Sequence, residues 1–319
     1  MESSHTLLSL SLIKGVGNVA LSLFNDYCKE EVKSLTKPGQ IIEVFKNLRN
    51  LNKRVKELDL KELERAFVKA DNIIKDSKKL GINITTINDP QYPKLLKSIK
   101  NYPLILHSKG SYSAISQKPT IAIIGTRTPS NFGIKLGKRI SDVIIENGFT
   151  IVSGLALGCD TLGHQAAINA NAQTVAVMAG GLDSVYPKEN SLLAAEIIDN
   201  NGLLISEHPI GVKPSRSTFI NRDRIQSGLS LGTLIIQTSE KGGTLHTAKY
   251  TLEQERVLAC IATDKDLEMN HDQFKGNKKL IKSGALEVSN QDQVLNFINE
   301  IYRKRDCFKK DEDRSELKF

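Results

Sequence analysis

The sequence lacks paired cysteines at the spacing of a metal or redox motif. Its four cysteines, Cys28, Cys159, Cys260 and Cys307, lie far apart in the chain, and none belongs to a CxxC pair. This spacing argues against a zinc site and against a disulfide framework. We therefore expect reduced thiols and no bound metal, which is typical of a cytoplasmic protein.

Long apolar runs and nucleotide fingerprints are also absent. No stretch approaches the length of a membrane-spanning helix, and the N-terminus lacks the basic and then apolar pattern of a signal peptide. Neither a GxGxxG fingerprint nor a Walker A lysine motif occurs, so a nicotinamide cofactor and ATP hydrolysis are not expected. We expect a cytoplasmic protein without a cofactor and without a membrane partner.

The composition is that of a globular, basic protein. With 319 residues, of which 39% are hydrophobic, the chain is long enough for two domains or for one large domain with an appendage. The formal net charge of +8 favours an acidic partner, although lysine-rich surfaces without such a partner are common. Charge alone therefore decides little.

Residues 121–167 carry the pattern around which the rest of the chain is organised. Two apolar runs, 121–124 and 149–152, each break at a glycine-containing loop, and each loop is followed by residues with helical spacing. This order predicts a parallel βαβα unit.

The two loops of this unit have the chemistry of a phosphate site. Ligands of parallel sheets bind beyond the carboxyl ends of the strands, where helix N-termini face an anion. Gly125 and Gly154 would let the backbone approach a phosphate closely, while Arg127 and Ser153 would donate hydrogen bonds to it. A phosphate-bearing ligand is therefore expected at this edge.

The pattern of apolar and charged residues divides the chain into two predicted domains and a tail. Residues 1–81 predict a small helical domain, whose Gly15-Val16-Gly17 turn resembles a helix-hairpin-helix or SAM-like module, although a plain turn is the favoured interpretation. Residues 82–302 continue the alternation of strands and helices and predict an extended Rossmann-like α/β domain with a parallel or mixed sheet. The charged residues 303–319 lack apolar periodicity and are expected to be disordered.

Residues 211–224 combine arginines with an aromatic residue, and we expect them to form a long polar loop. Guanidinium groups pair with phosphates while a ring stacks on a base, so this composition favours nucleic acid. For Phe219 alone, anchoring of the loop to the core is an equal alternative. The candidate DNA contacts in this segment and in two further loops at the same edge are Arg216, Phe219, Arg222, Arg224, Lys188, Gly242, Gly243 and Thr244.

Ordered motifs over residues 83–286 resemble those of the DNA-processing protein A family, also called DprA or Smf. The motifs are GTR with Gly133, SGLALGCD followed by His164, GLDSVYPKEN, SEHPIG, FINRDRIQSGLS, GGTLHTA and KGNKKLIKSGA. Their number and order make the resemblance far more specific than any single glycine loop.

The resemblance implies an extended Rossmann-like fold and a cytoplasmic mediator that is not an enzyme. Such a protein binds single-stranded DNA as a homodimer. It loads a RecA-type recombinase onto the strand during natural transformation of competent cells and thereby serves DNA recombination. By motif position, the DNA groove of the family corresponds here to Arg127, Lys188, Arg216, Phe219 and Arg222.

The sequence departs from the family pattern in places. The usual Arg-Asn-Arg reads Arg222-Asp223-Arg224, so a carboxylate either pairs with the flanking arginines or repels DNA. Residues 242–244 replace a Ser-Gly-Ser loop and keep its hydrogen-bonding groups, whereas residues 262–264 replace a Pro-Gly pair and are expected to change that loop. The residues after 285 are too few for the C-terminal winged-helix domain of many members, so we expect none.

Two other functions stay open. The same superfamily includes LOG-type nucleoside-monophosphate phosphoribohydrolases, but their helix glutamate is missing from residues 243–247, and a sensor of free nucleotides would also fit the glycine loops. Asp160 and His164, four residues apart on a predicted helix, could form an acid/base pair, although a helix-start aspartate and a hydrogen-bonded histidine are the favoured interpretation. The basic segment argues for a polymer, since a mononucleotide needs few cations.

Overall fold

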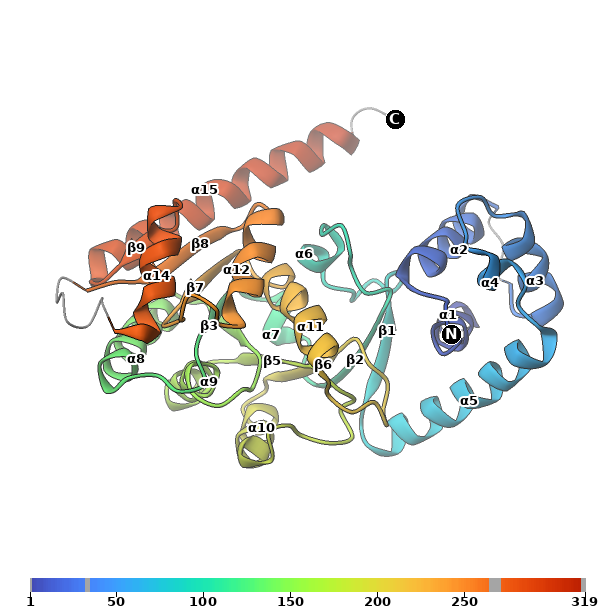
Figure 1. The fold of residues 1–319 in the computed structure, drawn as a ribbon, viewed down its shortest axis with the longest axis horizontal. Helices are drawn as coiled ribbons and strands as arrows, with labels where there is room; N and C mark the ends of the chain where they lie inside the picture. Colours follow the sequence, from blue (N-terminus) through green and yellow to red (C-terminus); the bar gives the residue numbers. More distant parts are fainter. Residues whose placement is uncertain (1, 32–34, 264–270, 317–319) are drawn as a thin grey trace.

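The computed structural model describes residues 2–31, 35–263 and 271–316. Its centre is a nine-stranded sheet in the order β1-β2-β6-β5-β4-β3-β7-β8-β9 (Figure 1). The strands are β1 (Asn83–Thr86), β2 (Ile105–Gly110), β3 (Thr120–Ile124), β4 (Thr150–Ser153), β5 (Thr174–Met178), β6 (Leu203–Ser206), β7 (Gly232–Ile235), β8 (Val257–Ile261) and β9 (Leu286–Val288). The strands from β6 to β9 pair in parallel, and β1 and β2 extend one edge in antiparallel pairing. The predicted mixed α/β fold is confirmed.

The direction of the chain reverses at β3. From β3 it proceeds strand by strand to β6, and it then crosses back to β7 on the other side of β3. Because parallel crossovers are right-handed, the two halves place their helices on opposite faces. The first half carries α8 (Asn131–Glu146), α9 (Cys159–Asn169) and α10 (Ser191–Asp199), and the second carries α11 (Arg216–Gly228), α12 (Thr244–Glu253) and α14 (Asp272–Lys282). The carboxyl ends of β3 and β7 form the topological switch point, where such folds bind ligands.

Helix α11 corrects the prediction of a long polar loop over residues 211–224. The loop ends at Ser215, whose hydroxyl accepts from the N–H of Thr218, while the Thr218 hydroxyl accepts from the N–H of Ser215. This capping box satisfies two of the donors that a helix start leaves free. The polar side chains from Arg216 onward therefore stand on a rigid helix.

The N-terminal residues form helices, as predicted. These are α1 (Glu2–Ser11), α2 (Asn18–Glu30), α3 (Pro38–Asn47), α4 (Lys53–Lys56) and α5 (Leu60–Lys79), and the short α6 (Lys94–Lys97) and α7 (Ser113–Ser116) follow in the α/β part. Leu8 and Phe24 share one apolar cluster with Leu104 and Leu106 of the sheet region. The proposed boundary between residues 81 and 82 falls between α5 and β1, but independent folding of the two parts stays a prediction.

The glycine turn before α2 packs on the body of the protein. Asn18 at the start of α2 donates a hydrogen bond of 3.3 Å to the carboxylate of Glu207, just after β6. This contact supports the interpretation of a plain helix-to-helix turn.

The C-terminal segment differs from the prediction of disorder. Helix α15 runs from Gln291 to Glu316 and thus includes most of the predicted tail, while residues 317–319 lie outside the described part. The segment is rich in lysine and arginine, which are good helix formers. Arg303 and Glu300 form an ion pair of 2.8 Å one turn apart. Of the altered loop at residues 262–264, Asp264 also lies outside the described residues.

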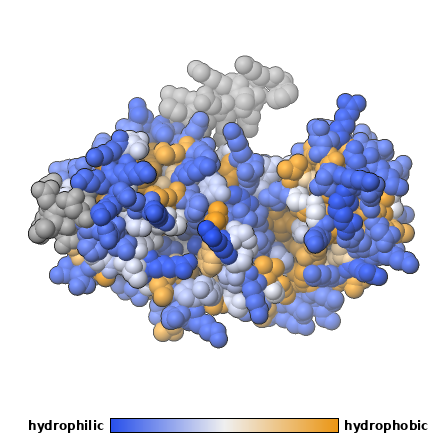
Figure 2. All heavy atoms as spheres, viewed as in Figure 1, coloured by the Kyte–Doolittle hydropathy of each residue, from blue (hydrophilic) through white to orange (hydrophobic). Residues whose placement is uncertain are grey.

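The surface is mostly hydrophilic. Figure 2 shows hydrophilic residues over most of one face, with apolar residues gathered mainly around the N-terminal helices. Among the described residues, no helix combines the length and the apolar character needed to cross a membrane. The same residues contain no cluster of three or more potential metal ligands, and Cys28, Cys159 and Cys260 are free thiols.

Candidate nucleic-acid interface

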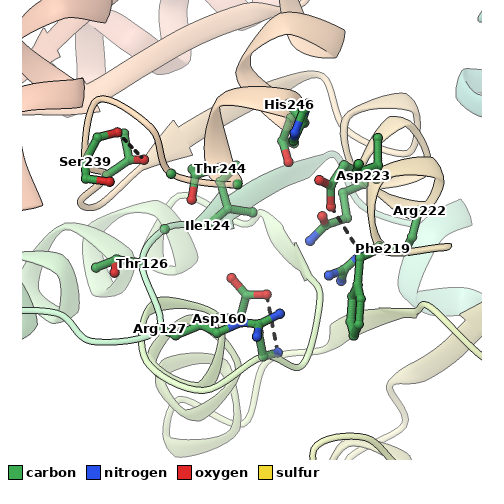
Figure 3. A pocket seen from close by; sticks show the side chains of 18 of the residues that line it. Ile124, Thr126, Arg127, Asp160, Phe219, Arg222, Asp223, Ser239, Thr244 and His246 are labelled. Carbon is green, nitrogen blue, oxygen red and sulfur yellow. Dashed lines mark hydrogen bonds and ion pairs between the residues drawn. The ribbon is translucent and has the colours of Figure 1, made fainter. Parts of the chain in front are cut away.

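A pocket of about 720 Å³ opens at the switch point, between the loops after β3 and β7 (Figure 3). Its volume lies within the usual range for small-molecule sites. The helices α11 and α12 form its other walls. Of the residues predicted from the sequence, it is lined by Gly125, Arg127, Asp160, Arg216, Phe219, Arg222, Gly242, Gly243 and Thr244.

Phe219 stands at the pocket rim within a small stack of side chains. The guanidinium carbon of Arg127 lies 5.4 Å from the centre of the Phe219 ring, and the Tyr186 ring lies 5.7 Å from it on another side. Tyr186 is about half exposed. The ring is partly exposed and contacts these rim residues, an arrangement that a stacking platform for a planar group would need.

Exposed cations surround this stack. Arg127, Arg216 and Lys241 line the pocket, and in the part of the chain that the structure describes none of them forms an ion pair with a carboxylate. Lys188 is exposed in the short 3₁₀ helix η1 (Lys188–Asn190), two residues from Tyr186, but it does not line the pocket. These positive charges are free to pair with phosphate groups.

The loop after β7 is held in place by Asn277 of α14. The Asn277 side chain accepts from the N–H of Thr238 at 2.8 Å and donates to the carbonyls of Ile236 and Ile261 at 2.9 and 2.8 Å. The loop leads directly into α12, where the N–H groups of Leu245 and His246 donate to the carbonyls of Gly242 and Gly243 at 3.1 and 2.9 Å. Gly242, Gly243 and Thr244 thus bring a helix N-terminus to the pocket, as the sequence predicted.

The arginines of the Arg-Asp-Arg segment are structural. Arg222 is 6% exposed, donates to the carbonyl of Val177 at 2.8 Å, and places Nε 3.3 Å from a carboxylate oxygen of Asp223. Arg224 donates to the carbonyls of Asn101 and Asn221 and forms an ion pair with Glu207, and it lies outside the pocket. The prediction that Arg224 faces a phosphate is not supported by this geometry.

Gly154 contacts residues of the protein interior, and its N–H group is bound there rather than open to a ligand. A Cβ atom at this position would overlap the guanidinium group of Arg222. The Gly154 N–H donates to the carboxylate of Asp160 at 3.1 Å, and the hydroxyl of Ser153 donates to the carbonyl of Ile123 at 2.6 Å. The second loop is therefore closed by internal hydrogen bonds, and the expected phosphate contacts of Ser153 and Gly154 are replaced by these.

Asp160 and His164 do not form the acid/base pair considered above. Asp160 is bound by the N–H groups of Gly154 and Ala156, and burial raises its pKa while Arg222 opposes the rise. The Nδ1 atom of His164 lies 2.8 Å from the hydroxyl of Thr174, and burial lowers the His164 pKa to about 3. The two side chains thus have separate hydrogen-bond partners, which agrees with the favoured interpretation.

Sequence reasoning missed Tyr186 and Lys241 as rim residues, and Gln226 and Thr238 as part of the lining. Lys241 directly precedes the glycines at the start of α12, so its position offered a signal. Gln226 offered none, because it was placed beyond the end of the expected loop.

Comparison with known proteins decides the family. A family model described as DNA recombination-mediator protein A matches residues 83–299, which is most of the chain. The chain belongs to the DNA recombination-mediator protein A family. The resemblance found in the motifs is thereby confirmed, and with it a role related to DNA processing and recombination.

Relatives in this family cover the chain to different extents. It is 36% identical to the DNA processing protein DprA of Bacillus subtilis, over 73% of this chain and 77% of that protein. It is 38% identical to the Smf protein of Synechocystis over 66% of this chain, and there it spans only about half (52%) of the relative's length.

Two solved structures of DprA proteins resemble this member of the family. The structure of DprA from Streptococcus pneumoniae matches with a TM-score of 0.76 and 26% identity, over 93% of this chain and 97% of that one. DprA from Helicobacter pylori, whose structure addresses its single-stranded DNA binding mode, matches with a TM-score of 0.59 and 26% identity, over 70% of this chain and 97% of that one.

Asp223 occupies the middle of the Arg-Asp-Arg segment and lines the pocket. It pairs with Arg222, while Arg224 turns away to Glu207. Burial raises the pKa of Asp223 to about 7; Asp160 adds to the rise, and Arg222 and Arg127 oppose it. The group thus changes charge near neutral pH, inside the pocket.

Replacing Asp223 with asparagine is expected to change how stability depends on pH. The folded protein keeps the Asp223 proton up to about pH 7. The unfolded chain, in which the carboxyl group has its ordinary pKa of 3.8, releases the proton at a lower pH. The native free energy of unfolding therefore falls between about pH 4 and about pH 7 because of this group, and the fall ends above that range. Relative to the native protein, Asp223→Asn should gain about 2 kcal/mol between about pH 5 and about pH 8.

Urea unfolding of both proteins at the two pH values measures this gain. Glu196→Gln, which removes an exposed carboxylate on α10, is the control and should give no comparable change. An equal difference between Asp223→Asn and the native protein at both pH values would contradict the prediction.

Proposed function

We propose that this protein binds single-stranded DNA at the switch-point pocket and acts as a recombination mediator. The observation that carries the proposal is the group of exposed cations, Arg127, Arg216 and Lys241, near the partly exposed ring of Phe219 and the exposed ring of Tyr186. Single-stranded nucleic acid needs this combination, because cations follow the phosphates while rings stack on the unpaired bases. The printed subject of the Helicobacter pylori structure, a single-stranded DNA binding mode, supports it.

The finer parts of the proposal rest on the family. In this proposal the protein works in the cytoplasm as a homodimer, protects incoming single strands and loads a RecA-type recombinase onto them during natural transformation or homologous recombination. It needs no cofactor and performs no catalysis. A recombinase-loading assay, in which the protein relieves a block of strand exchange on coated single strands, tests this part separately from DNA binding.

Fluorescence anisotropy with a labelled single strand, a duplex and a mononucleotide across a salt series tests the binding step. Each neutralised phosphate contributes about −0.7 to the slope of log affinity against log salt for a single strand, so three cations predict a slope near −2. We expect the single strand to bind most tightly, and its affinity to fall about tenfold or more between about 50 and about 200 mM salt. An affinity for the single strand that does not change with salt concentration would contradict the proposal. Equal affinities for the single strand and the mononucleotide would also contradict it.

A nucleotide sensor or a LOG-like N-glycosidase is the alternative. One observation favours it: Asp223, with a pKa raised to about 7, lies in a pocket large enough for a nucleotide, as a general acid would. Tight binding of the mononucleotide alone would support a sensor. Release of free base from a nucleoside monophosphate, lost in Asp223→Asn, would support the hydrolase.

A further inference from the structure

Helix α11 presents a stripe of different chemical groups to the pocket. The residues on this face follow at helical spacing and are, in order, a cation, a ring, a carboxylate and an amide: Arg216, Phe219, Asp223 and Gln226. Phe219 and Asp223 are four residues apart, so they lie one turn apart, about 6 Å along the helix axis. Figure 3 shows both on the α11 side of the pocket, with Arg127 on the side of the β3 loop. A planar group held near the ring would bring its edge close to the carboxylate.

The Asp223 carboxylate keeps one oxygen available to a ligand. Its Oδ1 atom lies 3.3 Å from Nε of Arg222, while Oδ2 forms no hydrogen bond with any described residue, and the side chain is 14% exposed where it lines the pocket. The charged groups that face it are Arg222 on its own helix, Asp160 on α9 and Arg127 after β3, and His246 of α12 lines the same pocket. A buried acceptor that opens only to the pocket discriminates between ligands by the donors they bring.

We propose that Asp223 is a specificity-determining residue, which makes the pocket prefer guanine over thymine in a single strand. This inference rests on the proposed binding of single-stranded DNA. The Watson–Crick edge of guanine carries two adjacent donors, N1–H and the 2-amino group, and the open Oδ2 atom of Asp223 can accept from both. Thymine offers one N–H between two carbonyl oxygens, which a carboxylate repels. Adenine and cytosine, with one amino group each, lie between these limits.

The asparagine found at this position in the family pattern would not discriminate in this way, because an amide both donates and accepts hydrogen bonds. Asp223→Asn therefore restores an unselective group of nearly the same shape. The substitution should change overall affinity and base preference in opposite directions. Removing the negative charge strengthens the attraction for phosphates, while it weakens the preference for guanine.

Competition anisotropy with oligothymidylates tests the inference. The competitors carry isolated guanines, inosines or adenines at every third position, so that no guanine runs occur. The native protein is expected to bind the guanine strand about tenfold more tightly than the thymine strand, and the inosine strand, which lacks the 2-amino group, at an intermediate level. In Asp223→Asn the guanine preference should fall below about threefold, while the affinity for oligothymidylate is kept or raised.

The outcomes separate the inference from the function on which it rests. A preference for guanine that survives unchanged in Asp223→Asn would come from the stronger stacking of purines and would overturn the inference, as would a native protein that binds all strands equally. In both cases single-stranded DNA binding itself would stand. Failure of the native protein to bind any strand would instead refute the proposed function.

A second readout uses the charge of the carboxylate. Because the pKa of Asp223 lies near 7, its ionised form increases between about pH 6 and about pH 8, and the guanine preference of the native protein should increase with it. Asp223→Asn should show no such increase. A native preference that falls over this range would contradict the assignment of an accepting carboxylate.

Discussion

Replacing Arg222 with methionine is expected to lower the free energy of unfolding by about 3–5 kcal/mol. The guanidinium group is the cation beside two carboxylates, Asp160 and Asp223, and it also satisfies the carbonyl of Val177. Methionine has a similar length but no donor and no charge, so it leaves the buried carboxylates without their counter-charge. Urea unfolding at about neutral pH, with a linear extrapolation to water, measures the loss.

The matched control for this change is Arg216→Met, on the same helix but exposed, which should change stability by less than about 0.5 kcal/mol. If the unpaired carboxylates cause the loss, the double variant Arg222→Met, Asp223→Asn should recover about 1 kcal/mol or more. A loss below about 1 kcal/mol in the single variant, or no recovery in the double variant, would show that Arg222 does not neutralise this buried site.

The double replacement of Arg127 and Arg216 by alanine is expected to weaken single-stranded DNA binding about 30-fold at moderate salt while the fold is kept. Both side chains are exposed at the pocket rim, and Arg127 also lies against the ring of Phe219. Loss of two phosphate contacts should reduce the slope of log affinity against log salt by about 1.4. Anisotropy titrations at several salt concentrations measure both quantities.

The control carries the same change of charge at a different place. Lys61 and Lys69 are exposed on α5, among the N-terminal helices, and their replacement by alanine should reduce affinity by less than about threefold. A similar loss in both double variants would mean that net charge, rather than the pocket rim, determines binding. Unfolding curves of the native protein and of both double variants exclude a loss of structure as the cause.

The strands were the part of the fold that could be predicted best. The buried strands β3, β5 and β8 are short apolar runs bounded by glycine or polar residues, and a sheet that is covered on both faces requires such runs. Helix α11 was missed because its polar residues leave little apolar periodicity, and its capping box at Ser215 was not recognised. The end of α15 was mistaken for disorder because charged residues satisfy both the composition of a disordered tail and that of a solvated helix.

The sequence by itself determined the fold class, the family and the loops at which the site lies, because these depend on local patterns and ordered motifs. Only the tertiary structure decided which side chains face the pocket. Arg222 and Arg224 look equivalent in the sequence, yet residues two apart on a helix point in different directions, so one lies beneath the pocket and the other pairs with Glu207. In the same way, Ser153 and Gly154 looked like phosphate contacts until the packing of Arg222 and Asp160 showed that their groups are bound inside the protein.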